Sequence, residues 1–296
     1  MTDTAVASRP LARRVFDNRP VRVVVLFVLV TLADALVQMG SVELVKRATP
    51  EDAVWFKLGA TTVSALALLF VYWLLVRMME HRRIAELGPR KAPGGLVAGA
   101  AIGLGLFSLA IALLSVMGVA KIAPAGSAGD LLAPANMAVL SGIGEELIFR
   151  GVVFRIFEEM FGSLVALIVS AAFFGAVHLA NPGATLVSGA AIALEAGLLL
   201  GVTYMAARNL WLPIGLHFGW NFAESAIFGS VVSGAAFKGL YATTLAGPDS
   251  LTGGKFGPEA SVVAVAVCAA AALAMLVVAF RRGEWKGLRL AANDRG

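Results

Sequence analysis

The side chains that could do chemistry in this sequence are carboxylates, imidazoles, one guanidinium and one amide within otherwise apolar stretches. They come from three separate segments and are Glu145, Glu146, Arg150, His178, His217 and Asn221. An Asp, Lys or Arg at membrane depth costs about 2.5 to 3.5 kcal/mol on insertion scales, so ionisable groups there are candidates for a functional role. Together, carboxylate, imidazole and amide groups could activate water and stabilise an oxyanion, which is the chemistry of hydrolysis.

The first segment contains two adjacent glutamates with different expected roles. Neighbouring residues on a helix point about 100° apart, so Glu145 and Glu146 cannot share one role. Glu146 lies four residues before Arg150, and this orientation favours an ion pair that lowers the cost of burying both groups. Glu145 is left without a partner and is suited to accept a proton from water. The alternative is a structural acid that bonds to a neighbouring helix.

Two of the three histidines lie in stretches predicted to be membrane helices. His178 or His217 alone could be a hydrogen-bonding packing group, but both together with an unpaired Glu145 favour a site. His81 belongs to a basic His-Arg-Arg sequence and is predicted to be solvated.

The third segment places His217, Asn221 and Glu224 at i, i+4 and i+7, so they are predicted to share one helix face. Asn221 could donate to an oxyanion or fix the tautomer of His217, or it could join two helices by a hydrogen bond. Glu224 lies nearer the helix end, where it is either solvated or part of the site. Asp34 and Glu195 are further acids in apolar sequence, expected to be structural or to line a cavity.

The elements that must position these residues are transmembrane helices. The 296 residues are 59% hydrophobic and 15% charged, with a mean hydropathy of +0.84, far outside the range of a soluble domain. Apolar stretches of about 20 residues recur along the chain, each long enough to cross a hydrocarbon core of about 30 Å. The sequence therefore predicts an all-α, polytopic membrane helix bundle of about eight transmembrane helices, with 1–296 as a single integral membrane domain.

The predicted helices follow from apolar runs bounded by charge, Pro and Gly. They cover residues 21–40, 55–78, 93–119, 134–157, 163–180, 184–206, 209–228 and 259–280. The catalytic core would be 134–225, and the Gly-broken run 229–247 reads as a loop or partly inserted segment that could line a cavity. Glycines of the third and sixth helices predict close helix packing: Gly95, Gly99, Gly103, Gly105, Gly189, Gly197 and Gly201.

The net charge of +5 reflects membrane orientation rather than nucleic-acid binding, because basic residues cluster at helix ends. One side collects Arg9, Arg13, Arg14, Arg19, Arg22, Arg77, Arg82, Arg83, Arg90, Lys91, Arg155, Arg208, Arg281, Arg282, Lys286, Arg289 and Arg295. The other side collects Lys46, Arg47, Lys57, Lys121, Lys238 and Lys255. The sequence thus predicts a multi-pass cell-membrane protein, surrounded by lipid, with both termini cytoplasmic. The single cysteine, Cys268, is expected to pack on a helix surface rather than act as a nucleophile.

The three segments resemble the motifs of a known family. Glu145-Glu146-x-x-x-Arg150, Phe174-x-x-x-His178 and His217-x-x-x-Asn221 occur in this order within about 80 residues. The pattern resembles the CAAX prenyl endopeptidase and bacteriocin-processing (CPBP, or abortive-infection) family of membrane proteases. The resemblance implies an endopeptidase acting on a membrane-associated or lipidated protein or peptide.

By the same resemblance, Glu145 would activate the hydrolytic water and His178 would share that water or a metal. His217 and Asn221 would stabilise the oxyanion, with Glu146 and Arg150 as the accompanying pair. If the reaction depends on a metal, Glu145, His178 and His217 could bind zinc. No His-Glu-x-x-His is present, so the usual zincin arrangement is missing and no cofactor is assigned.

Other functions compete with proteolysis by Glu and His. A rhomboid-type serine site at Ser141 lacks the Gly-x-Ser-Gly motif, because residue 139 is Val. A non-catalytic membrane scaffold or immunity protein and a proton-coupled transporter remain the alternatives. The protease interpretation makes a geometric prediction: the polar ends of Glu145, His178 and His217 should converge within about 3 to 5 Å of one point. Asn221 should lie on the rim of that site, and Glu146 should turn away toward Arg150.

Overall fold

A computed structural model describes residues 17–46 and 53–288 of the chain. Its longer helices are α3 (Arg19–Lys46), α4 (Ala53–Glu80), α5 (Ala92–Val116), α6 (Leu132–Glu146), α7 (Arg155–Phe161), α8 (Ser163–Val177), α9 (Leu186–Ile192), α10 (Leu198–Ala207), α11 (Trp211–Asn221) and α13 (Val262–Arg281). Short turns of helix are η1 (Ala85–Leu87), η2 (Pro89–Lys91), η3 (Ala128–Leu131), η5 (His178–Ala180), α12 (Asp249–Thr252) and η8 (Pro258–Ala260). Several basic residues used to predict orientation lie outside the described residues: Arg9, Arg13, Arg14, Arg47, Arg289 and Arg295.

Helices occupy all eight predicted spans, and the polytopic helical bundle is confirmed. Among the described residues, 6 helices are long and apolar enough to cross a membrane. The other two expected spans are the motif-bearing stretches that begin with α6 and α11. The first carries the charged side chains of the site, and the second is short, so composition and length alone do not mark them as membrane spans.

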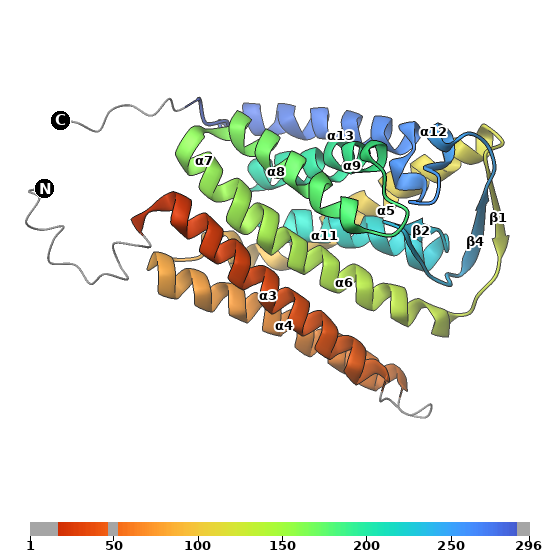
Figure 1. The fold of residues 1–296 in the computed structure, drawn as a ribbon, viewed down its shortest axis with the longest axis horizontal. Coiled ribbons are helices and arrows are strands. Elements are labelled where there is room, and N and C mark those ends of the chain that lie inside the picture. The colour runs from red at the N-terminus through yellow and green to blue at the C-terminus, as the bar shows by residue number, and fades with distance from the viewer. Residues whose placement is uncertain (1–16, 47–52, 289–296) are drawn as a thin grey trace, which may run out of the picture.

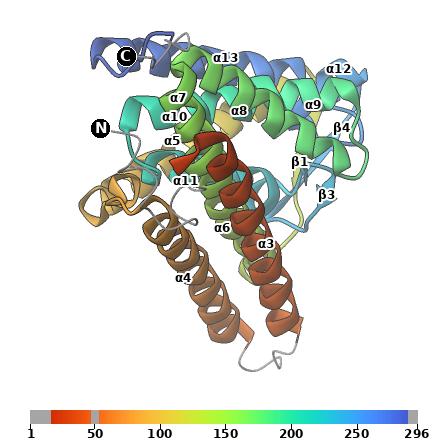
Figure 2. The same ribbon diagram turned by 60° about the vertical axis from the view of Figure 1, so that its left-hand side comes forward.

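The helices are arranged around the motif-bearing elements. α3 and α4 pack side by side and project from one side of the bundle, whereas α13 packs on α10 at the opposite side (Figures 1 and 2). α6 and α8 run between these two sides (Figure 1). The start of α3 and the end of α13 lie at the same end of the molecule, away from the strands (Figure 1).

Glycines allow α5 and α11 to pack backbone against backbone. A Cβ on Gly99 or Gly103 would overlap the backbone of Leu212 or Leu216, and one on Gly215 would overlap that of Leu96. The predicted packing role of the third helix's glycines is confirmed at these positions, whereas a Cβ on Gly105 would meet nothing. Such close approach fixes the position of α11 and therefore of His217.

Three of the helical stretches widen into π-helical turns. These turns are η4 (Leu147–Phe154), η6 (Ala193–Gly197) and η7 (Phe222–Ile227). π-Helical turns are rare and frequently occur at functional sites. Each turn holds a buried ionisable residue: Arg150, Glu195 and Glu224, respectively. The widened turns reorient these side chains away from the regular 3.6-residue periodicity.

The run 229–247 forms short strands joined by loops. β2 (Val231–Val232) and β3 (Ala235–Ala236) make a hairpin around Ser233 and Gly234, which both have positive φ. β4 (Tyr241–Leu245) pairs antiparallel with β1 (Ala120–Pro124), Ala120 lying opposite Leu245. The hairpin residues Val232, Ser233 and Ala235 line a cavity, as one reading of this run anticipated.

Candidate active site

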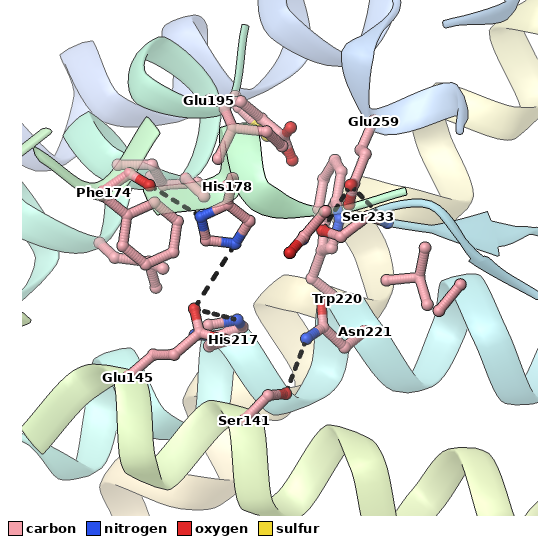
Figure 3. A pocket seen from close by; sticks show the side chains of 18 of the residues that line it. Ser141, Glu145, Phe174, His178, Glu195, His217, Trp220, Asn221, Ser233 and Glu259 are labelled. Carbon is pink, nitrogen blue, oxygen red and sulfur yellow. Dashed lines mark hydrogen bonds and ion pairs between the residues drawn. The ribbon is translucent and has the colours of Figure 1, made fainter. Parts of the chain in front are cut away.

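The three motifs meet at one internal cavity of about 260 Å³. Its polar lining residues are Ser141, Glu145, His178, Asn181, Glu195, His217, Asn221, Ser233 and Glu259. Figure 3 shows these side chains arriving from several elements far apart in sequence. The cavity therefore contains every predicted candidate except the Glu146–Arg150 pair, which lies just behind it.

Glu145 faces both histidines across a gap that a water molecule could bridge. Glu145 Oε2 lies 3.8 Å from His178 Nε2 and 4.0 Å from His217 Nε2 (Figure 3). The Glu145 side chain is 25% exposed, whereas the His178 side chain is 11% exposed. Glu145 Oε2 is buried and has no hydrogen-bond partner. These three polar ends converge as the sequence-based prediction required.

Each imidazole is held by its Nδ1 so that its Nε2 points at Glu145. His178 Nδ1 lies 2.7 Å from the backbone oxygen of Phe174, which can only accept, so Nδ1 carries the proton. His217 Nδ1 lies 3.0 Å from Glu146 Oε1 and donates to that carboxylate. Fixing Nδ1 determines the tautomer and orientation of each ring.

Glu146 and Arg150 form the predicted ion pair. Arg150 Nη1 lies 2.9 Å from Glu146 Oε1, and both side chains are 0% exposed. Arg150 Nη2 also donates to the backbone oxygens of Ala196 and Gly197 at 3.0 and 3.1 Å, where η6 ends. Its guanidinium packs 4.7 Å from the centre of the Phe174 ring.

The prediction that Glu146 turns away from the site is wrong in one respect. The same Oε1 atom that accepts from Arg150 also accepts from His217, so Glu146 connects the ion pair to the site. The sequence could not show this contact, because it joins helices 71 residues apart.

Asn221 lies on the cavity wall but does not contact His217 Nδ1. Its Nδ2 donates to Ser141 Oγ at 3.1 Å (Figure 3). The role of fixing the His217 tautomer therefore falls to Glu146. An amide nitrogen carries two N–H groups, so Asn221 keeps one for a ligand in the cavity.

Two acids besides Glu145 line the cavity, and only one of them was named as a candidate from the sequence. Glu195 does so as expected, and Glu259, which sequence reasoning missed, does so as well. The sequence does offer a signal for Glu259, which is a carboxylate that follows a proline at the start of the last predicted helix. Asp34 packs against the backbone of Gly144 and accepts a hydrogen bond from Gln38.

Glu224 is fully buried rather than solvated. It accepts a hydrogen bond from Trp220 Nε1 at 3.2 Å and is not among the residues that line the cavity. The π-helical η7 begins directly after Asn221 and shifts Glu224 off the face predicted from regular spacing.

The residues considered for zinc are not arranged as a metal site. Within the described parts of the chain, no group of three or more His, Cys, Asp or Glu side chains is placed to hold a metal ion. Tetrahedral zinc with bonds of about 2.0 to 2.1 Å would hold the ligand atoms about 3.4 Å apart. The separations of 3.8 and 4.0 Å are wider, so a metalloprotease is not supported.

Comparison with known proteins gives one match. Residues 127–223 match the family model of Rce1-like type II CAAX prenyl endopeptidases. No curated protein matches the chain, and no solved structure does. At the level of the family, the match supports a CAAX-type membrane protease. The resemblance inferred from the three motifs is therefore confirmed: over residues 127–223 this chain is similar to the Rce1-like type II CAAX prenyl endopeptidases.

Proposed function

We propose that this protein is an intramembrane endopeptidase in which Glu145 activates a water molecule. The observation that carries the proposal is the convergence of His178 Nε2 and His217 Nε2 on Glu145 Oε2. This carboxylate oxygen has no hydrogen-bond partner, whereas the other side of each imidazole is anchored. Packing alone gives no reason for these three groups to face one cavity.

The proposed reaction needs no group beyond these side chains, the peptide and water. Glu145 takes a proton from water as the water oxygen attacks the peptide carbonyl carbon, while His178 Nε2 accepts the water's second hydrogen bond. The tetrahedral intermediate then collapses as Glu145 returns the proton to the leaving nitrogen and the C–N bond breaks. One carboxylate thus serves as base and then as acid.

Oxyanion stabilisation is assigned to His217 and Asn221. An imidazolium that donates Nδ1–H to Glu146 still has its Nε2–H available for the oxyanion, and this is the protonation state the mechanism requires. Asn221 supplies the N–H that is not bonded to Ser141. Donors fixed before the reaction stabilise developing charge most effectively.

The substrate is proposed to be a membrane-associated or lipidated protein or peptide. The cavity lies inside a bundle with large exposed apolar side chains, such as Leu36, Phe70 and Leu273, which suit a lipid environment shared with such a substrate. No nucleic acid is expected as a partner. The metal-dependent variant of the proposal has zinc bound by Glu145, His178 and His217, and loss of cleavage in the presence of a chelator would reveal it.

The proposal is tested with the purified full chain in detergent. Lipidated and unlipidated peptide libraries would be incubated with wild type, with Glu145→Gln, and with wild type plus a strong chelator, and products identified by mass spectrometry. We expect internal cleavage by wild type with and without chelator, and none by Glu145→Gln. No cleavage of any peptide would favour a scaffold or immunity role, and proton-driven uptake in vesicles would favour a transporter.

We also propose that both termini are cytoplasmic in the cell membrane. The start of α3 and the end of α13 lie at the same end of the bundle (Figure 1). Basic residues of this end, each in an ion pair, include Arg22, Arg155 and Arg208. After replacement of the buried Cys268, single cysteines at exposed Ser127 or Arg83 would be labelled in intact cells. We expect labelling at 127 and protection at 83; the reverse would invert the orientation.

A further inference from the structure

Three carboxylates that the mechanism does not use gather beside the catalytic groups. Glu195, Glu224 and Glu259 come from η6, η7 and η8 and are 2%, 0% and 3% exposed. Glu224 interacts electrostatically with both of the others. Glu195 and Glu259 line the cavity, on the far side of His178 from Glu145 (Figure 3).

These carboxylates, here called the acidic wall, have no positive partner within the protein. No Lys or Arg among the described residues makes an ion pair with any of the three, although each other fully buried glutamate that carries an ion pair does so with Arg or Lys. His178, on the cavity side, interacts electrostatically with Glu259. Glu224 and Glu259 are joined by a hydrogen bond, so a proton is shared between these two carboxyl groups, whereas Glu195 has neither a counterion nor such a proton partner within the described part of the chain.

Within the acidic wall, Glu195 is the carboxylate without a strong hydrogen bond. Glu224 and Glu259 hydrogen-bond to each other. Glu195 Oε2 is buried and has no hydrogen-bond partner, and its other oxygen has only the weak donor Cys268 Sγ, 3.9 Å away. A buried acceptor without a donor is rare in native proteins, and Glu195 lines the cavity. A ligand in the cavity that carries N–H donors would satisfy it.

The carboxyl group of Glu259 is held at the cavity by two hydrogen bonds. Its Oε1 accepts from both the backbone N–H and the hydroxyl of Ser233 at 2.7 Å. These two donors fix the position of the Glu259 carboxyl group at the cavity wall. The cavity beside it holds about 260 Å³, enough for a long side chain, and the residues are not placed to hold a bare metal ion.

We propose that the acidic wall is a substrate subsite for a positively charged side chain, best filled by the planar guanidinium of an arginine. A guanidinium carries five N–H donors in a fixed fork that matches carboxylates. This inference rests on the proposed protease function and adds to it a specificity: a basic residue close to the scissile bond. The wall is a binding element and takes no part in bond breaking.

The test compares arginine with citrulline, which has nearly the same shape but carries a neutral ureido group with fewer N–H donors and a carbonyl oxygen. Peptides cleaved by wild type would carry either residue at each of the two positions on both sides of the scissile bond. We expect kcat/KM to be at least tenfold higher for arginine at one position. In Glu195→Gln and Glu259→Gln the arginine-to-citrulline ratio should fall toward one. Glu284→Gln, which alters a partly exposed carboxylate that binds Arg208 and does not line the cavity, should keep it.

Binding separates failure of the subsite from failure of the protease. Fluorescent arginyl and citrullinyl peptides would be titrated into the inactive Glu145→Gln protein, with anisotropy as the readout. Tighter binding of the arginyl peptide supports the subsite even if no peptide is cleaved by wild type. Equal binding and equal cleavage of the two peptides at every position would overturn the proposed subsite. The acidic wall would then be a cluster of neutral, protonated acids. The wild-type comparison decides the point even if a Gln variant fails to fold.

Discussion

Two groups of buried carboxylates differ in what neutralises them. At the end of the bundle where the described chain starts and stops, Glu80, Glu86 and Glu158 each bind arginine or lysine. Around the cavity, Glu145 faces two histidines. Among the described residues, Glu195 has no basic partner, and its carboxylate has only the thiol of Cys268 as a hydrogen-bond donor. A carboxylate whose charge is satisfied locally holds helices together, whereas one left facing a cavity is available for water or a substrate.

The paired group forms one connected network between helices. Arg155 binds Glu80 at 2.6 Å and also donates to the backbone oxygen of Gly151 in the π-helical η4. Tyr72 donates to Glu86 at 2.9 Å and lies against the same Gly151. The network therefore fixes the helix that carries Glu145 from its far end.

The Glu146–Arg150 pair shares a feature with each group: Arg150 neutralises Glu146 within the protein, and Glu146 also binds His217 at the cavity. Loss of this pair should have the largest effect on folding. Arg150→Ala leaves Glu146 as a buried charge without a counterion, so we expect a loss of about 3 to 5 kcal/mol in unfolding free energy. Denaturation of the purified protein in detergent would measure it. Glu146→Leu combined with Arg150→Met should recover most stability but not activity, because His217 loses its Nδ1 partner. Wild-type stability of Arg150→Ala would show that the pair is not buried.

A change to the packing of α5 on α11 should lower the unfolding free energy less than loss of the Glu146–Arg150 pair, but more than a change to the ion pairs of Glu158. Gly103→Ala places a methyl group against the backbone of Leu216, and overpacking of this kind costs about 1 to 3 kcal/mol. Because Leu216 precedes His217, activity should fall together with the melting temperature. The matched control is Gly105→Ala, whose Cβ meets nothing and should change neither. Equal behaviour of the two variants would contradict the close α5–α11 contact.

The smallest expected effect is a pH dependence at the paired end. Burial alone would raise the pKa of Glu158, but hydrogen bonds from Arg208, Lys286 and Ser163 outweigh it and hold that pKa below the ordinary value of 4.5. A lowered folded-state pKa stabilises the protein above about pH 4.5, and this stability is lost as pH falls through the folded value. The melting temperature of Glu158→Gln should therefore depend less on pH below about 4.5 than that of wild type. An identical acid profile would exclude this contribution.

Sequence reasoning located the elements and the motif residues because their signals are local. Apolar runs marked eight helical stretches, and the spacing of Glu146 and Arg150 predicted their ion pair. The convergence of Glu145, His178 and His217 was predicted from the protease interpretation, because one water or metal can be shared only if their polar ends meet.

What sequence reasoning missed depends on contacts between distant segments or on irregular helix geometry. The Glu146–His217 hydrogen bond joins helices far apart in the chain. The π-helical turns carry no periodicity signal, so the burial of Glu224 behind Trp220 was not predicted. Glu259, the first residue of the last predicted helix, lies at the cavity in the η8 turn. The strand β4 pairs with β1, which lies more than 100 residues away in the chain.

The most direct test asks whether Glu145 and His178 act as one unit on one water. We would measure kcat/KM on a cleaved peptide for Glu145→Gln, His178→Gln and the double variant, each checked for a wild-type melting temperature. Loss of a general base typically costs about 10² to 10⁴-fold, and residues acting as a unit are strongly non-additive. We predict that the double variant is no slower than Glu145→Gln alone. A fully active Glu145→Gln, or losses that multiply in the double variant, would contradict the proposed hydrolytic centre.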